Sequence, residues 1–140
     1  MEIEGLDELI NRLNLKEREM PRAISEAVNK LGNSLKERTV RKTPIGKSYK
    51  NHTGGTLKRS WHVKKVDAST VIVYNPEHYA PHVEYGHRTR LGAGKSKGYK
   101  PKEGGIKYVE GVYMLTRSLE DMDDLLGIEF DSIIQNLWKD

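Results

Sequence analysis

The chain has 140 residues, with 24 Lys and Arg, 20 Asp and Glu, a formal net charge of +4 and no cysteine. This length predicts one domain over residues 1–140, and the missing cysteines exclude a disulfide scaffold, a cysteine zinc site and a thiol nucleophile. No apolar run approaches the roughly 20 residues that cross a bilayer, and the acidic N-terminal sequence is unlike a signal peptide. We therefore expect a soluble, intracellular α+β protein with no membrane partner.

The charges divide the chain into three segments. Residues 1–40 have a net charge of −1, residues 41–107 carry fifteen basic and four acidic side chains for a net charge of +11, and residues 108–140 have a net charge of −6. A basic middle segment is typical of contact with nucleic acid. The same asymmetry is typical of self-association, in which the basic face of one copy meets the acidic face of the next. A mixed, soluble surface is the third interpretation.

The first 42 residues are predicted to be helical. Two apolar sets follow helical spacing: Leu6, Leu9, Ile10 and Leu13, then Ile24, Val28, Leu31 and Leu35. Each set makes one stripe on a helix, and Pro21 stands between them, where proline fits a first turn but breaks an interior. We predict helices over about 4–18 and 21–42, with residues 1–20 as a separate N-terminal helix. A single kinked helix is the alternative, and Thr43-Pro44 ends the helical region in either case.

A polar loop over residues 44–57 leads into a region of strands. The segments 60–66 and 70–74 are rich in β-forming residues and lie close enough to pair as a hairpin. The segment Tyr79–Tyr85 is predicted as a short third strand or an edge segment, limited by Pro81.

Residues 86–107 contain six glycines, seven Lys or Arg and few apolar side chains, which predicts a long, mobile, basic loop. From Val112 onward apolar residues again follow helical spacing, and Gly127 marks a bend. The fold class is therefore α+β. We predict two long amphipathic helices, N- and C-terminal, that pack on one face of a small antiparallel sheet.

Few residues suggest chemistry. Two Gly-Lys-Ser triplets, at 46–48 and 94–96, lack the earlier glycine and the strand–loop–helix context of a phosphate loop. The histidines between residues 78 and 87, with Glu84 among them, allow a metal site, but polar surface histidines are the simpler interpretation. No nucleophile elbow and no Ser/His/Asp set at a recognised spacing is present. We predict no catalysis, no metal and no cofactor.

The basic stretch is the strongest functional signal. Its side chains can lie along a phosphate backbone or order against an acidic partner. The interface or DNA-channel candidates are Arg88, Arg90, Lys95, Lys97, Lys100, Lys102 and Lys107. Trp61, between charged neighbours in a predicted strand, is interpreted as a core aromatic, with an interface anchor as the alternative.

Several landmarks occur together in a fixed order. A helix ends at Thr43-Pro44, the sequence Leu57-Lys58-Arg59-Ser60-Trp61 follows a glycine, and Tyr79-Ala80-Pro81-His82-Val83-Glu84-Tyr85-Gly86 precedes the basic loop. Tyr113-Met114-Leu115 then opens a final helix. In this order the chain resembles, over nearly its whole length, the small head–tail joining, neck or tail-completion proteins of long-tailed bacteriophages and prophages. The matching positions are Leu57, Ser60, Trp61, Tyr79, Ala80, Val83, Glu84 and Gly86, while the loop before Leu57 is longer than the family pattern.

This resemblance implies a structural assembly protein without catalysis or cofactor. Its expected partners are copies of itself in a ring around the DNA channel, the head connector and the tail-tube proteins. It implies a location in the host cytoplasm during assembly and then at the head–tail junction of the virion. Glu84 and Gly86 fall at a turn whose glycine permits the bend into the basic loop. The residues alone also support an alternative, a nucleic-acid-binding module that makes non-specific DNA contacts through residues 88–107.

Overall fold

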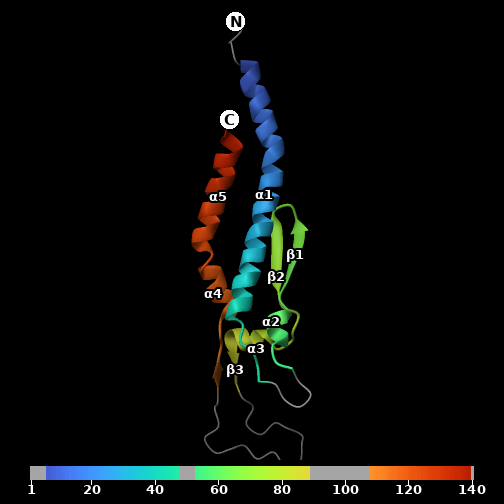
Figure 1. The fold of residues 1–140 in the computed structure, drawn as a ribbon, viewed down its shortest axis with the longest axis vertical. Coiled ribbons are helices and arrows are strands. Elements are labelled where there is room, and N and C mark those ends of the chain that lie inside the picture. Colours follow the sequence, from blue (N-terminus) through green and yellow to red (C-terminus); the bar gives the residue numbers. More distant parts are fainter. Residues whose placement is uncertain (1–5, 48–52, 89–107, 140) are drawn as a thin grey trace, which may run out of the picture.

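A helix of 37 residues, α1 (Leu6–Lys42), extends along most of the molecule in the computed structural model, which describes residues 6–47, 53–88 and 108–139 (Figure 1). The other elements follow in chain order: α2 (Thr56–Arg59), β1 (His62–Asp67), β2 (Thr70–Tyr74), α3 (Ala80–Tyr85), β3 (Gly86–His87), β4 (Val109–Glu110), α4 (Met114–Glu120) and α5 (Asp123–Trp138). The strands form two antiparallel pairs, β1 with β2 and β3 with β4. This mixture of helices and small sheets confirms the α+β class.

α1 is one continuous helix, so the prediction of two helices that separate at Pro21 is wrong. Proline has no N–H to donate to the carbonyl four residues earlier, but this part of α1 is exposed, so water can satisfy that carbonyl. Acidic side chains lie in the first turn and basic side chains in the last, which suits the helix dipole. Of the alternative, a single kinked helix, the structure confirms that the helix is single.

β1 and β2 form the predicted hairpin. Val63 pairs with Val73, and the register shifts at Val66, before Asp67. The Ser69 N–H donates to Asp67 Oδ1 across 2.8 Å and closes the turn. This hydrogen bond is the main reason that the pKa of Asp67 lies below its ordinary value.

Gly32 permits the close approach of the hairpin to α1. A Cβ atom at this position would lie 2.6 Å from Val71 Cγ1, closer than packed carbon atoms can approach. Lys65 also donates from the hairpin to Ser25 Oγ on α1. One side of α1 is therefore shaped for the hairpin.

The segment 79–85, predicted as a strand or edge segment, is largely the helix α3. Pro81 lies in the first turn of this helix, where the missing N–H has no intrahelical acceptor to leave unsatisfied. β3 follows directly and pairs with β4, so Gly86 and His87 form a strand where a loop was predicted. The predicted mobility of the remaining loop concerns residues 89–107, which lie outside the described residues.

The C-terminal helical region divides at Asp121 and Met122, and the predicted bend at Gly127 is wrong because Gly127 lies inside α5. Met122 is buried, and its N–H donates to the Leu119 carbonyl across 3.0 Å. Lys42 Nζ donates to Asp121 Oδ2, which ties the end of α1 to this turn. The same hydrogen bond is the main cause that lowers the pKa of Asp121.

The two long helical regions do not share one face of a sheet, contrary to the prediction. α4 and α5 pack along α1, while the hairpin packs on the other side of α1 (Figure 1). A two-stranded hairpin is too narrow to cover two helices, so α1 becomes the central element. Every helix in the described ranges is too short or too polar to cross a membrane.

Candidate functional site

Most of the motif positions gather at one end of the molecule, where α2, α3 and α4 meet the end of α1 (Figure 1). The buried residues of this region, called the base, are Leu57, Trp61, Ala80 and Met114. Partly buried hydrophobic side chains pack against them: Val40, Val73, Tyr79, Val83, Val112 and Leu115. Five of the motif positions are therefore core residues of the base, namely Leu57, Trp61, Tyr79, Ala80 and Val83.

Trp61 joins the end of α1 to the hairpin. Its side chain is 4% exposed, as predicted for a core aromatic, and its indole Nε1 donates to Thr43 Oγ1 across 2.9 Å. The Thr43 hydroxyl in turn donates to the Thr39 carbonyl across 2.6 Å. The buried indole N–H is therefore satisfied, and the helix terminus that precedes Pro44 is held by the core.

Ser60 connects α2 to the segment after β2. Its hydroxyl donates to Glu77 Oε1 across 2.8 Å. Asn75 Nδ2 donates to the Leu57 carbonyl across 2.8 Å, and the Glu77 N–H donates to Asn75 Oδ1 across 3.1 Å. This motif serine therefore fixes the loop that leads into α3.

Glu84 has a role that the sequence alone did not reveal. Its carboxylate is buried and accepts the N–H groups of Leu115 and Thr116, across 3.0 and 2.9 Å, and the Thr116 hydroxyl across 2.8 Å. These N–H groups belong to the first turn of α4, which has no intrahelical acceptor for them. Glu84 therefore caps α4 from α3, where a negative charge also suits the helix dipole.

Gly86 and Gly111 bring the two ends of the basic stretch together. Gly86 has φ +84°, a conformation that favours glycine. A Cβ atom on Gly111 would lie 2.2 Å from the Glu84 carbonyl oxygen, so glycine permits this contact. The Tyr108 hydroxyl adds a hydrogen bond of 2.9 Å to the Tyr85 carbonyl. Residues 88 and 108 therefore leave the base side by side.

The basic candidates lie mostly outside the described residues. Arg88 is exposed directly after β3. The other six are Arg90, Lys95, Lys97, Lys100, Lys102 and Lys107, and the second Gly-Lys-Ser triplet falls in the same stretch. Their interface or DNA-channel role stays a prediction.

The three histidines do not converge. His78 precedes α3 and its ring lies 5.3 Å from that of Tyr79, while the rings of His82 and His87 are 5.7 Å apart. Within the part of the chain that the structure describes, no group of three or more His, Asp or Glu is arranged to hold a metal ion.

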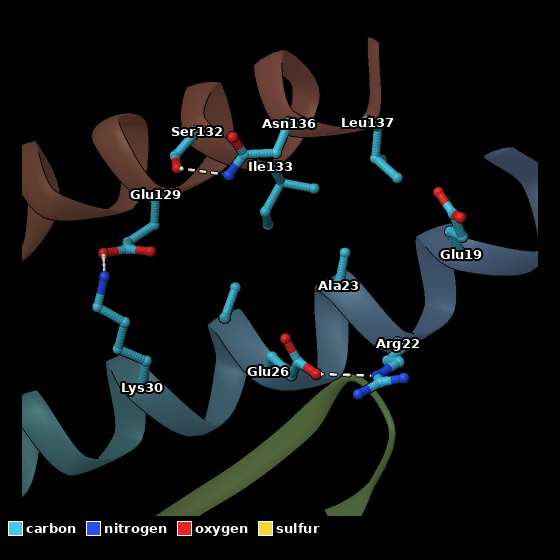
Figure 2. A pocket seen from close by; sticks show the side chains of 11 residues that line it. Glu19, Arg22, Ala23, Glu26, Lys30, Glu129, Ser132, Ile133, Asn136 and Leu137 are labelled. Atoms are coloured by element: carbon cyan, nitrogen blue, oxygen red, sulfur yellow. Dashed lines mark hydrogen bonds and ion pairs between the residues drawn. The ribbon is translucent and has the colours of Figure 1, made fainter. Parts of the chain in front are cut away.

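A pocket of about 520 Å³ lies between α1 and α5 (Figure 2). Figure 2 shows Ala23 on α1 opposite Ile133 and Leu137 on α5. The charged side chains at its rim include two ion pairs, Arg22 with Glu26 and Lys30 with Glu129. This lining is that of a seam between two helices, with small residues on one side and paired charges at the edge.

A larger apolar groove of about 710 Å³ lies between the hairpin and the C-terminal helices. Its floor is formed by Val28, Leu31 and Leu35 of α1. Its walls include Val71 of β2 and Leu119 and Leu126 of the C-terminal helical region. Carbon atoms line most of this groove, which suits a protein side chain better than a polar substrate.

The family model described as "Bacteriophage HK97-gp10, putative tail-component" matches residues 7–86. These residues comprise most of α1, the hairpin and the base as far as Gly86. Neither a curated protein nor a solved structure matches the chain. The match confirms the resemblance to phage assembly proteins, and the chain belongs to the HK97-gp10-like family of bacteriophage tail components.

Proposed function

We propose that the chain is a structural assembly protein of a phage or prophage virion, a subunit of a ring at the head–tail junction around the DNA channel. Family membership supports the role of a tail component. The observation that carries the ring is the exposed surface. Among the described residues seven hydrophobic side chains are buried, whereas twenty large ones are exposed. Exposed apolar surface on this scale favours burial against other proteins.

One of the exposed surfaces lies along α5. Phe130, Ile134 and Trp138 recur every four residues and are exposed, so they form one stripe along the helix. Asp124 and Asp131 are exposed beside this stripe. This side of the molecule is therefore apolar and acidic.

A second exposed surface is the outer face of the hairpin, on the other side of α1 (Figure 1). Lys64 pairs with Ile72 and His62 with Tyr74, and all four side chains are exposed. The His62 and Tyr74 rings lie 5.6 Å apart. This side is apolar and basic.

Two different faces of opposite charge suit a heterologous interface, in which each copy binds the next through another surface. Such an interface generates a ring when the rotation between copies closes. The expected partners are copies of the chain, the head connector and the tail-tube proteins. The expected location is the host cytoplasm during assembly and the head–tail junction afterwards.

Electron microscopy of the purified protein tests this proposal, first alone and then with its tail-tube protein. We expect closed rings with a central opening, at least when the tail-tube protein is present. A chain that neither forms rings nor binds the end of a tail tube would contradict the proposal.

DNA binding through residues 88–107 is a separate prediction, which a binding measurement on the same purified protein can test. If several of the seven Lys and Arg side chains contact phosphates, the affinity for duplex DNA will fall steeply as the salt concentration rises. Little binding at about 0.1 M salt would leave assembly as the role of the chain.

A further inference from the structure

The apolar stripe of α1 continues beyond the part of the helix that its own chain accompanies. Residues 6–20 are called the arm, and its N-terminal part extends past the end of α5 and past the hairpin turn (Figure 1). Its C-terminal part lines a pocket together with Trp138 of α5 and Ser69 of the hairpin turn. Leu6, Leu9, Ile10 and Leu13 on the arm are 44–52% exposed. Half-exposed apolar side chains in one stripe along a helix favour burial against a further protein surface.

The arm stripe and the floor of the groove lie on the same side of α1. Eighteen residues correspond to about five helical turns, so Leu6 has the same orientation as Ile24, and Leu13 has the same orientation as Leu31. Between them lies a pocket of about 510 Å³ that Leu13, Met20, Ile24 and Trp138 line. One apolar surface therefore extends along the whole helix, bare at the arm and flanked by two walls at the groove.

The groove matches the arm in length and chemistry. Its floor from Val28 to Leu35 and the arm stripe from Leu6 to Leu13 are each about 12 Å long, at 1.5 Å per residue. An amphipathic helix that presents apolar residues at spacings of three and four is the usual occupant of an apolar groove between two walls. The arm presents such a stripe, because Leu6, Leu9, Ile10 and Leu13 are spaced three and four residues apart and are about half exposed.

The charges at the two edges also complement each other. Glu120 and Asp123 line the groove on the side of the C-terminal helices. Arg12 and Lys16, one turn apart, border the arm stripe, and Arg12 pairs with Glu8 within the arm across 3.4 Å. An arm that lies in the groove can therefore place a basic edge against an acidic wall.

We propose that the arm of one copy docks in the groove of a second copy of this chain, with Leu9, Ile10 and Leu13 against Leu31, Leu119 and Leu126. The second copy is favoured over another protein because both the stripe and its complement lie on this chain. The proposal rests on the assembly role in one respect only, which is that the partner is another copy. It also names the contact through which copies would join.

Cysteine cross-linking tests the contact directly, because the chain has no cysteine of its own. Copies that carry Ile10→Cys are mixed with copies that carry Leu119→Cys and treated with a short bismaleimide. Leu15→Cys is the matched control, since Leu15 is 56% exposed on the opposite face of the arm. We expect several-fold more cross-linked product from Ile10→Cys than from Leu15→Cys. Equal yields from the two, or none from either, would overturn the proposal.

Sedimentation velocity of two arm variants supplies the second test. Ile10→Asp should weaken association at least about tenfold, because it places a charge in a desolvated contact. Leu15→Asp, with the same chemical change on the opposite face, should associate as the parent does. Circular dichroism checks that both variants keep the parent's helix content.

A parent chain that remains monomeric at all concentrations, or two variants that associate alike, would contradict the arm docking. Closed dimers with the Ile10–Leu119 cross-link would support the docking and contradict the ring. Rings without that cross-link would support the ring and contradict the docking.

Discussion

The base and the arm lie at opposite ends of the same molecule and are built in opposite ways. At the base, Trp61, Met114 and Glu84 are buried, and hydrogen bonds satisfy the indole and the carboxylate. At the arm, a stripe of leucine and isoleucine is half exposed along one helix. The base therefore holds the fold together, while the arm leaves apolar surface exposed, which we propose serves association. Substitutions at the base should therefore change stability, and substitutions at exposed apolar positions should change assembly.

The largest effect is expected from the two tryptophans, which allow the comparison with one residue type. Trp61→Ala removes a 4% exposed side chain and its hydrogen bond, and should lower the free energy of unfolding by about 4 kcal/mol. Trp138→Ala removes a 59% exposed side chain and should change it by less than about 1 kcal/mol. Urea denaturation followed by circular dichroism measures both. Equal losses of stability in the two variants would mean that buried and exposed apolar side chains do not differ in their contribution to the fold.

Removal of the Glu84 cap should have the next largest effect. Glu84→Ala leaves the N–H groups of Leu115 and Thr116 without an acceptor, which should destabilise the fold by about 3 kcal/mol. Glu84→Gln keeps one acceptor oxygen and should lose about half as much. Glu120→Ala, an exposed change on α4, is the control and should stay within about 0.5 kcal/mol of the parent. If Glu84→Ala melts like the control, the cap contributes nothing to stability.

Alanine substitutions at two glycines should change stability by smaller amounts and in opposite directions. Gly86→Ala places a Cβ 2.5 Å from the Val109 carbonyl oxygen at φ +84° and should destabilise the fold by about 2 kcal/mol. Gly127→Ala meets open space inside α5 and should stabilise it by about 0.5–1 kcal/mol, because alanine is the better helix former. Thermal unfolding of the two variants measures shifts of opposite sign. A shift of the same sign in both would contradict the positions assigned to these glycines.

The smallest effect concerns the Lys42–Asp121 pair, which joins the end of α1 to the turn between α4 and α5. The hydrogen bond from Lys42 lowers the pKa of Asp121, so its contribution is present at neutral pH and is lost as the pH falls through that lowered pKa. Asp121→Asn should therefore have a slightly lower urea midpoint than the parent at pH 7. The difference should begin to shrink as the pH falls below about 4, the ordinary pKa of aspartate, and should disappear below the lowered pKa. It should also shrink in high salt, because the pair is exposed. A difference that grows towards low pH would contradict this sign.

Several features of the fold were predictable because they depend on local pattern. The hairpin followed from β-branched residues on both sides of a short turn. The burial of Trp61 was predictable because an aromatic side chain in a predicted strand is usually part of the core. The apolar stripe of α1 is visible in the spacing of its leucines, although Pro21 suggests a break that the structure does not contain.

The features that failed prediction depend on contacts between distant segments. Pro81 is compatible with an edge strand and with the first turn of a helix, and only the packing of α3 in the base selects the helix. Glu84 binds residues 31 and 32 positions later, which no local motif announces. The division at Met122 reflects a buried side chain and the turn closed by its backbone, whereas Gly127 has no neighbour that would bend the helix.

Local composition settled that the first and last segments are helical, that a hairpin lies between them, that the apolar stripe of α1 exists, and that positive charge gathers in residues 41–107. Tertiary structure decided that α1 lies between the hairpin and the C-terminal helices, and that one half of its stripe becomes a groove while the other half stays bare. The physical reason is that periodicity marks an apolar face but does not say what covers it. Coverage depends on where α5 and the hairpin end along α1, and that position is set by contacts far apart in the sequence.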